Sequence, residues 1–387
     1  MSRELLTANH AAAMAAVLAG RANRAARGFG SGIYPITPQS ESIELLCQLP
    51  IEKGHVVRVE SEHSAMAVCT GFAWGGARTF TASSANGLAY MIENVYVAAF
   101  SRLPVVMMAV NRTLGPPWNI WADHGDTLML RDTGWIQFYC EDNQEVFDTV
   151  LLAFRLAEDH RVLLPVLVCL DAFVLSHTMM LIDLPEQEAV DAFLPLLQLP
   201  HRLTDRPRVV GGLDCPHEVE VHRRQLVEAM ARVPAVYAEV QQAFATRFGR
   251  RPDDALVAYR LDDAELVLVS MGTTAATARQ AVDEARARGV RAGSVRVRMF
   301  RPLPLGPLAA LLGPARRVAV IDRDISPGLG GVLWGELRGG LGADRLVQGY
   351  VVGLGGGDIR PQHLGRILDD LASRERAGEP ALVEVGA

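Results

Sequence analysis

Short β-rich runs alternate with helical patterns along the first 200 residues, and this alternation limits the possible folds more than any other feature. It favours a mostly parallel sheet covered by helices. A second α/β pattern follows a Pro-, Arg-, Asp- and Gly-rich stretch at 200–213 and a helical stretch at 217–248. The strands are predicted at 32–36, 55–59, 79–83, 105–110, 135–139 and 165–170, and the helices between them at 62–77, 88–100 and 144–158.

The chain is long enough for more than one domain. It has 387 residues, of which 49% are hydrophobic and 21% charged, so two or three domains are expected. We predict a first domain at 1–200, a connector with its own helix at 201–255, and a smaller α/β domain at 256–387. In the last domain the predicted strands are 265–270, 291–298 and 317–322, and the predicted helices are 275–288 and 362–373.

Charge and cysteine content exclude several classes of protein. The formal net charge is −6, which gives no reason to expect a nucleic-acid partner. The five cysteines form no CxxC pair, so this chain can build neither a disulfide framework nor an iron–sulfur or zinc site. The apolar stretch Ala11–Gly20 follows Glu4 and has no basic region before it, so we interpret it as a core-facing helix. Val162–Leu175 is too short to span a bilayer, and we expect a cytoplasmic protein without a membrane segment.

Glu62 opens the most unusual helical pattern of the sequence. The stretch "VRVESEHSAMAVCTGFAWGGART" at 57–79 has no formally charged residue between Glu62 and Arg78. A helix without a polar face is expected to be buried, and its N-terminus stabilises a negative charge. Glu62 therefore lies at the entrance to the interior. It could simply cap the first turn of the helix, but the apolar helix behind it favours a functional carboxylate.

Two other strand ends carry candidate residues. "GIYPITPQSE" at 32–41 has Pro35 and Pro38 on either side of Ile36 and Thr37, so the backbone is rigid and non-helical there and could present the Thr37 hydroxyl. An ordinary strand-to-helix connector has the same pattern. Arg112 follows the strand at 105–110, where ligands bind in parallel sheets, and a guanidinium can fork two hydrogen bonds onto a carboxylate. An exposed loop arginine is the alternative.

A third group of polar residues follows Arg112. Asp123, His124 and Asp126 have the residue types of metal ligands. They lie in one loop without a partner from another element. We therefore predict a polar packing loop and assign no metal ligand in this chain.

These motifs, in their order and spacing, resemble the α subunit of the multisubunit pyruvate:ferredoxin oxidoreductases, within the 2-oxoacid:acceptor oxidoreductase superfamily. The resemblance rests on "YPITPQSE", "VESEHSAM", "GARTFTASSANGLAYMIENVY", "RDTGWIQFYCEDNQEVFD", "MGTTAATARQAVDEARARGVRAGSVRVRMFRPLP" and "DRDISPGLGG", and it covers nearly the whole chain. It implies a thiamine diphosphate-binding pyrimidine-domain fold with a parallel sheet. A transketolase C-terminal-like α/β domain is expected to follow.

The resemblance also implies roles for the candidate residues. Glu62 matches the glutamate that hydrogen-bonds N1′ of the cofactor's aminopyrimidine, and Pro35 and Ile36 fall in the loop beside the cofactor. Thr37 matches a substrate-contacting threonine, and Arg112 matches the arginine that pairs with the 2-oxoacid carboxylate. Both contacts suit an anionic substrate held with its carbonyl carbon facing the cofactor.

The sequence lacks other parts that such an enzyme needs. The GDG-plus-Asn signature that binds the magnesium diphosphate is absent, and so is a cluster-binding cysteine set. The resemblance therefore implies a β subunit with the diphosphate-binding domain, and γ and δ ferredoxin-like subunits. Mg²⁺ and [4Fe-4S] clusters are expected on these partners, with pyruvate, coenzyme A and ferredoxin as the reactants.

Several alternatives stay open at this stage. The "VNR…PPWNIW" segment at 110–121 is typical of the pyruvate branch, but few residues separate it from a branched-chain 2-oxoacid or 2-oxoglutarate enzyme. A nicotinamide-dependent dehydrogenase would need a GxGxxG fingerprint between a strand and a helix, and none is found. A noncatalytic scaffold subunit is expected to have lost Glu62, Thr37 or Arg112, and all three are present.

Overall fold

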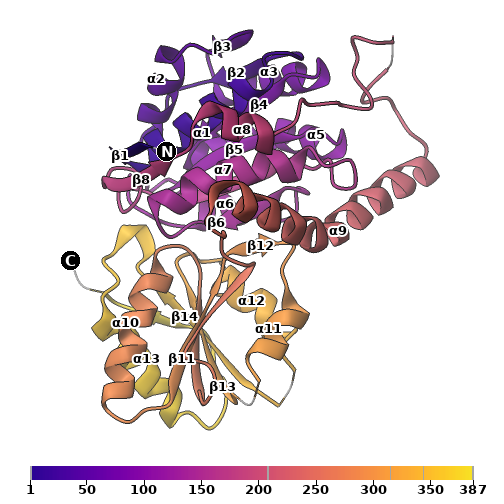
Figure 1. Cartoon of the computed structure of the whole chain (residues 1–387). Coiled ribbons are helices and arrows are strands. Elements are labelled where there is room, and N and C mark those ends of the chain that lie inside the picture. The colour runs from indigo at the N-terminus through magenta and orange to yellow at the C-terminus, as the bar shows by residue number, and fades with distance from the viewer. Residues whose placement is uncertain (1, 207–208, 314, 343, 386–387) are drawn as a thin grey trace.

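The computed structural model describes residues 2–206, 209–313, 315–342 and 344–385. In these residues the chain forms two α/β units, with the second unit below the first in Figure 1. Among the described helices, none is both long enough and apolar enough to cross a membrane.

The first unit is built on a sheet of seven described strands in the order β12-β6-β7-β5-β4-β2-β3. All strand pairs in it are parallel except the pair at the edge, β12 with β6. A short antiparallel pair, β1 (Ser2–Leu6) with β8 (Met180–Leu184), lies outside the sheet. The sheet strands are β2 (Phe29–Ile33), β3 (Gly54–Arg58), β4 (Arg78–Ser83), β5 (Val105–Asn111), β6 (Ile136–Tyr139), β7 (Val166–Asp171) and β12 (Met299–Arg301).

The helices of the first unit largely follow the predicted pattern. The stretch predicted at 88–100 forms two helices that break at Met91, and the stretch predicted at 144–158 forms one. The long connector helix α9 runs along the first unit near the second (Figure 1). The helices are α1 (Ala8–Ala22), α2 (Ser40–Gln48), α3 (Glu62–Trp74), α4 (Ala85–Tyr90), α5 (Ile92–Phe100), α6 (Gly125–Leu128), α7 (Asn143–Ala157), α8 (Gln187–Phe193) and α9 (Pro216–Phe248).

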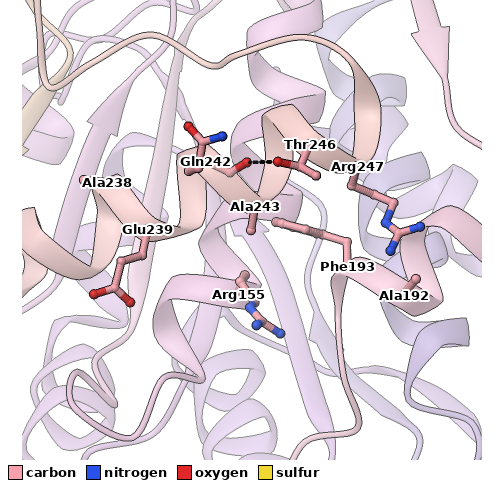
Figure 2. A pocket seen from close by; sticks show the side chains of 9 residues that line it. All are labelled: Arg155, Ala192, Phe193, Ala238, Glu239, Gln242, Ala243, Thr246 and Arg247. Atoms are coloured by element: carbon pink, nitrogen blue, oxygen red, sulfur yellow. Dashed lines mark hydrogen bonds between the residues drawn. The ribbon is translucent and has the colours of Figure 1, made fainter.

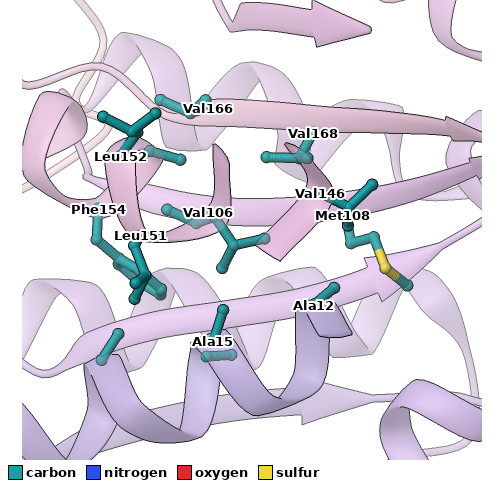
Figure 3. Close-up of a cluster of buried hydrophobic side chains, with 14 of the residues drawn as sticks. Ala12, Ala15, Val106, Met108, Val146, Leu151, Leu152, Phe154, Val166 and Val168 are labelled. Atoms are coloured by element: carbon teal, nitrogen blue, oxygen red, sulfur yellow. The ribbon is translucent and has the colours of Figure 1, made fainter. Parts of the chain in front are cut away.

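One core cluster of the first unit lies between the sheet and the helices α1 and α7, and a second lies on the other face, against α3 and α5. Figure 3 shows alanines of α1, among them Ala12 and Ala15, against the strand residues Val106 and Met108, and all four are fully buried. Small side chains let α1 approach the sheet closely, so the apolar stretch at 11–20 forms a core helix, as predicted.

Helix α3 is only partly buried, so the prediction of a wholly buried helix is wrong for this chain. Glu62, Met66 and Cys69 face the interior, whereas Ala67 and Gly71 are exposed. The reason is that the helix packs on the sheet with one face, and no described segment of the chain covers the other. An uncharged helix face is thus left open beside Glu62.

The second unit is a six-stranded sheet of the order β15-β14-β13-β10-β11-β9 within the described residues, parallel except for β9. The fold class predicted from the sequence is confirmed, whereas the exact domain boundaries stay a prediction. The elements are β9 (Leu256–Tyr259), β10 (Leu266–Ser270), α10 (Thr274–Ala287), β11 (Ala292–Val297), α11 (Leu305–Leu311), β13 (Arg317–Asp322), α12 (Val332–Arg338), β14 (Leu346–Val352), a 3₁₀ turn η1 (Leu354–Gly356), α13 (Pro361–Ser373) and β15 (Ala381–Val383).

A buried ionic network joins the two units. Glu145 of α7 accepts hydrogen bonds from the Arg296 guanidinium, at 2.7 and 3.0 Å, and from Arg298 Nε. Arg296 also bonds Asp253 at 2.7 Å. Both arginines are almost completely buried, so the carboxylates must compensate the loss of water around the charged guanidinium groups.

We therefore expect Glu145→Ala to destabilise the protein by about 3 to 5 kcal/mol, because it leaves two buried guanidinium groups without their shared carboxylate. Urea denaturation followed by circular dichroism measures this change. Glu220→Ala is the control: it removes an exposed partner of Arg224 on α9 and should change the midpoint far less. Equal shifts for the two variants would contradict the assigned role of the network.

Candidate active site

The candidate residues lie at the carboxyl ends of four neighbouring parallel strands. In the sheet order β5-β4-β2-β3, Arg112 follows β5, the segment Ser84–Gly87 follows β4, Thr37 follows β2, and Glu62 follows β3. Parallel strands direct their carboxyl ends to one edge of the sheet, which is where such sheets bind ligands. The sequence predicted this edge from three separate motifs.

Glu62 begins α3 and is 8% exposed. Ser61 caps the helix by accepting a hydrogen bond from the Ser64 amide at 3.2 Å, so the cap does not need the Glu62 side chain. Among the described residues, no donor makes a hydrogen bond to the Glu62 carboxylate. The carboxylate therefore keeps its hydrogen-bonding capacity at a position that the helix N-terminus favours for negative charge.

Arg112 is 7% exposed, and its guanidinium makes no hydrogen bond or ion pair with a described residue. Its Nε is buried without a partner, and the guanidinium lies 5.3 Å from the centre of the Trp118 ring. Burial lowers the pKa of Arg112 from its usual value, while the nearby charges of Asp126 and Glu62 oppose that shift. Arg112 and Glu62 are thus close enough to interact, and each has unused hydrogen-bonding groups.

Thr37, Pro35 and Ile36 lie in the loop that follows β2. Thr37 and Pro35 are exposed and Ile36 is half-buried. The loop is tied down by its neighbours: the Gln39 side chain donates to the Tyr34 carbonyl at 3.0 Å, and Asn9 donates to the Pro38 carbonyl at 2.7 Å. The Thr37 hydroxyl makes no hydrogen bond to Glu62 or Arg112, so Thr37 shares the sheet edge with them without being bonded to either.

The turn after β4 packs directly on Glu62, a contact that sequence reasoning missed. A Cβ atom added at Gly87 would lie 2.7 Å from Glu62 Oε1 and 2.5 Å from Ser83 Oγ. Ser83 and Ser84 hold buried hydroxyls without a partner among the described residues. The sequence signal was the glycine in "SSANGL", which marks a close approach of the backbone.

The side chains of Asp123, His124 and Asp126 have different hydrogen-bond partners and do not converge on one point. Asp126 accepts hydrogen bonds from Ala85 N at 2.9 Å, Arg112 N at 3.1 Å and Asn111 Nδ2 at 2.8 Å. Burial raises the pKa of Asp126 to about 7, against these hydrogen bonds. No group of three His, Cys, Asp or Glu residues suited to a metal occurs in the part of the chain that the structure describes.

His124 and Asp123 face the second unit. His124 Nε2 lies 2.7 Å from Asp171 Oδ1, and Asp171 also accepts a hydrogen bond from the Thr273 amide at 3.1 Å. Burial alone would lower the pKa of His124, but the Asp171 carboxylate outweighs burial and raises it. Asp123 accepts a hydrogen bond from the Gly355 amide at 3.3 Å. The loop therefore connects the candidate site to the second unit.

Two cavities differ in their relation to this edge. One of about 430 Å³ opens between the units, next to Arg112 in sequence, and includes Thr113, Asp123, Asp324 and Gly355 in its lining. Another, of about 740 Å³, lies among α7, α8 and α9. Figure 2 shows its lining, in which the charged residues are Arg155, Glu239 and Arg247. None of the candidate residues lines this second cavity, so it does not belong to the site.

Two family models match the chain, one in each unit. Residues 24–242 match the family described as "Pyruvate flavodoxin/ferredoxin oxidoreductase, thiamine diP-bdg", and residues 264–364 match "Pyruvate:ferredoxin oxidoreductase core domain II". The matched models thus place the chain in a class of thiamine diphosphate-binding α/β proteins. The chain belongs to the 2-oxoacid:ferredoxin oxidoreductase family and corresponds to its α subunit.

Curated relatives match over nearly the whole chain. The pyruvate synthase subunit PorA of Methanothermobacter thermautotrophicus is 41% identical, with 97% of each chain covered. The PorA of Thermotoga maritima is 42% identical over 87% of this chain and 88% of the relative. The ketoisovalerate oxidoreductase subunit VorA of Pyrococcus abyssi is 40% identical over 97% of this chain and 95% of the relative.

Solved structures share the fold. The 2-oxoglutarate:ferredoxin oxidoreductase from Magnetococcus marinus, solved with 2-oxoglutarate, coenzyme A and succinyl-CoA bound, has a TM-score of 0.74 at 18% identity. That likeness covers 95% of this chain and 65% of the other. A split-gene transketolase, in an inactive β4 tetramer, has a TM-score of 0.58 at 13% identity, with 96% and 99% covered. At these identities the likeness concerns the fold alone.

The contact between Gly87 and Glu62 can be tested by Gly87→Ala. The added Cβ must displace the Glu62 carboxylate, so we expect at least a roughly tenfold loss of thiamine diphosphate affinity in the assembled protein, measured by calorimetry. Gly365→Ala on α13 is the control, because a Cβ there meets nothing within 4 Å. Alanine also favours a helix more than glycine does, so poorer helix formation cannot explain a loss at Gly87. Unchanged affinity in Gly87→Ala would show that the Glu62 position is unimportant for the cofactor.

Proposed function

We propose that this chain is the α subunit of a thiamine diphosphate-dependent pyruvate:ferredoxin oxidoreductase. The complex converts pyruvate and coenzyme A to acetyl-CoA and carbon dioxide, and passes two electrons to ferredoxin. Family membership supports the reaction class, and the PorA relatives, at 38–42% identity, support pyruvate as the oxoacid. We further propose that the complex works in the cytoplasm.

One observation carries the assignment of the site. Glu62 and Arg112 are buried at one sheet edge, interact through their charges, and have no hydrogen-bond partner for their charged groups among the described residues. Buried charged groups are normally paired within the protein. An acceptor and a donor left unused in this way fit two ligands that meet in the site, a cofactor with a ring nitrogen at Glu62 and a substrate with a carboxylate at Arg112.

In this proposal each residue has one task. Glu62 hydrogen-bonds N1′ of the aminopyrimidine and holds the proton there, with Pro35 and Ile36 beside the ring. Arg112 forks onto the oxoacid carboxylate, and Thr37 donates its hydroxyl to the substrate. Thiamine diphosphate supplies the carbon nucleophile and the electron sink that decarboxylation of a 2-oxoacid requires.

The remaining parts of the site are assigned to partner subunits. The described cysteines are all free, three of them are buried, and they are dispersed through the chain. We therefore assign the [4Fe-4S] clusters to the partner subunits, among them the β subunit, which also holds Mg²⁺ and the diphosphate. The exposed, uncharged face of α3 next to Glu62 supports a partner that closes over the site.

Glu62→Gln tests the cofactor assignment. Glutamine keeps the size of the side chain but cannot hold the proton, so we expect kcat to fall at least about 100-fold in the purified complex. Acceptor reduction with pyruvate, coenzyme A and thiamine diphosphate under anaerobic conditions measures this, and gel filtration checks that the complex is assembled. Turnover near the wild-type value in an assembled variant would exclude Glu62 from catalysis.

Arg112→Lys tests the substrate assignment and the choice of oxoacid together. Lysine keeps the charge but loses the fork, so kcat/KM should fall by about tenfold or more, mainly through KM. The carboxylate is common to pyruvate and to 2-ketoisovalerate, the branched-chain oxoacid that the VorA similarity favours as the second candidate. The fold decrease in kcat/KM should therefore be the same for both substrates. The ratio of the wild-type kcat/KM values for the two oxoacids then identifies the physiological substrate. An unchanged kcat/KM for both would reject the carboxylate contact.

A further inference from the structure

Asp126 is a fully buried carboxylate that touches two parts of the candidate site without belonging to it. It lies in the short helix α6, outside the strands that carry Glu62 and Arg112. Its Oδ2 accepts from both Ala85 N and Arg112 N, at 2.9 and 3.1 Å, and its Oδ1 accepts from Asn111 Nδ2 at 2.8 Å. One side chain therefore ties together the loops that follow β4 and β5.

The bond to Ala85 fixes the turn that packs on Glu62. Ala85 has a φ of 41°, in the left-handed region that a residue with a Cβ rarely adopts. Such backbone persists only where its surroundings hold it. Two residues later, Gly87 lies so close to Glu62 Oε1 that a Cβ there would come within 2.7 Å. A shift of this turn would therefore move the surface on which the Glu62 carboxylate rests.

The bond to Arg112 fixes the other candidate residue through its backbone. The Arg112 guanidinium has no hydrogen bond to a described residue and lies 5.3 Å from the centre of the Trp118 ring. The orientation of the Arg112 side chain therefore depends on the position of its backbone. Asp126 fixes that position by accepting a hydrogen bond from the Arg112 amide. The preceding residue, Asn111, is held as well, because its side chain donates to Thr127 at 2.6 Å and to Asp126.

We propose that Asp126 is a positioning residue that sets the spacing between Glu62 and Arg112 by binding the Ala85 and Arg112 amides through one oxygen. The inference rests on the proposed function, because the spacing matters only if the cofactor and the oxoacid meet between these residues. It assigns to Asp126 no contact with either ligand.

The hydrogen-bond pattern predicts different effects for two substitutions. Asp126→Ala leaves two buried amides without an acceptor, and both loops can move. Asp126→Asn keeps an oxygen for the two amides. Its NH₂ group then faces Asn111, whose own Oδ1 is unpartnered and can accept once the Asn111 amide turns over. The asparagine variant should therefore keep the spacing although the charge is gone.

The test is steady-state kinetics of the assembled complex. We expect Asp126→Ala to lower kcat/KM for the oxoacid by roughly 10- to 100-fold, the cost of a misplacement of about 1 Å. The KM for the oxoacid and the half-saturating concentration of thiamine diphosphate should both rise. Asp126→Asn should stay within about threefold of wild type, because the acceptor is kept.

Asp148→Ala is the matched control. It removes another buried carboxylate, which accepts hydrogen bonds from Gln144 and Arg250, away from the strand-end loops. It should lower stability and the amount of active complex while leaving both half-saturating concentrations unchanged. If Asp126→Ala behaves like this control, or leaves both concentrations unaltered, Asp126 has only a structural role and the inference is wrong. An asparagine variant as impaired as the alanine variant would also reject it, because the effect would then come from the charge.

Hydrogen–deuterium exchange of the same variants separates this inference from the proposed function. Asp126→Ala should speed exchange in peptides that contain Ala85 and Arg112, and not in peptides of α13. If the wild-type complex used no oxoacid, the proposed function would fail, and the exchange would still decide whether Asp126 holds the two loops. Unchanged exchange at both amides would overturn the inference even in an active enzyme.

Discussion

The parallel pairing of β5, β4, β2 and β3 is the constraint on which the site depends. Because these strands end at the same edge, residues separated by up to 75 positions, from Thr37 to Arg112, are delivered to one side of the sheet. The pairing brings the loops near one another but does not fix their spacing. That spacing is set by local contacts, above all by Asp126 between the loops after β4 and β5 and by Gly87 against Glu62. Buried hydrogen bonds of this kind are strong because water cannot replace them.

Contacts with the second unit also hold the first sheet and the loops at its carboxyl edge. β12, which belongs to its part of the sequence, pairs with β6 of the first sheet, and Glu145 of α7 holds Arg296 and Arg298. The loop after Arg112 is connected to the same unit by the His124 amide, which donates to the Arg323 carbonyl at 2.9 Å, and by Asp123, which accepts from the Gly355 amide. A movement of the second unit would therefore change the position of the segment that contains Asp126. The fold thus links the second unit, which carries no candidate residue, to the loop that follows Arg112.

Most of the fold could be predicted because strands and helices carry local signals. β-branched runs marked β5 and β7 to within a residue, and the uncharged stretch after Glu62 marked α3. The strand predicted at 32–36 lies at 29–33, because Gly28 and Gly30 hid its start and Pro35 ends it. β12 is only three residues long and pairs with a strand over 150 positions away, which no local pattern reveals. For the site, the uncharged helix after Glu62 and the strand end before Arg112 were visible signals. The role of Asp126 could not be predicted, since it consists of hydrogen bonds to backbone amides of two other loops.

The open face of α3 explains why a helix can look buried in sequence and yet be exposed in the folded chain. Ala67 and Gly71 have no side chain that water would solvate well, and nothing in the described chain covers them. A protein surface that stays uncharged over a whole helix is expected to meet another surface. The open face of α3 lies next to Glu62 and along the same sheet edge as Arg112. Among the described residues, neither the Glu62 carboxylate nor the Arg112 guanidinium has a hydrogen-bond partner. An uncovered apolar face and two unused charged groups at one place support the proposal that a partner subunit completes the site. Under the same proposal, the diphosphate signature that this chain lacks is expected on that partner.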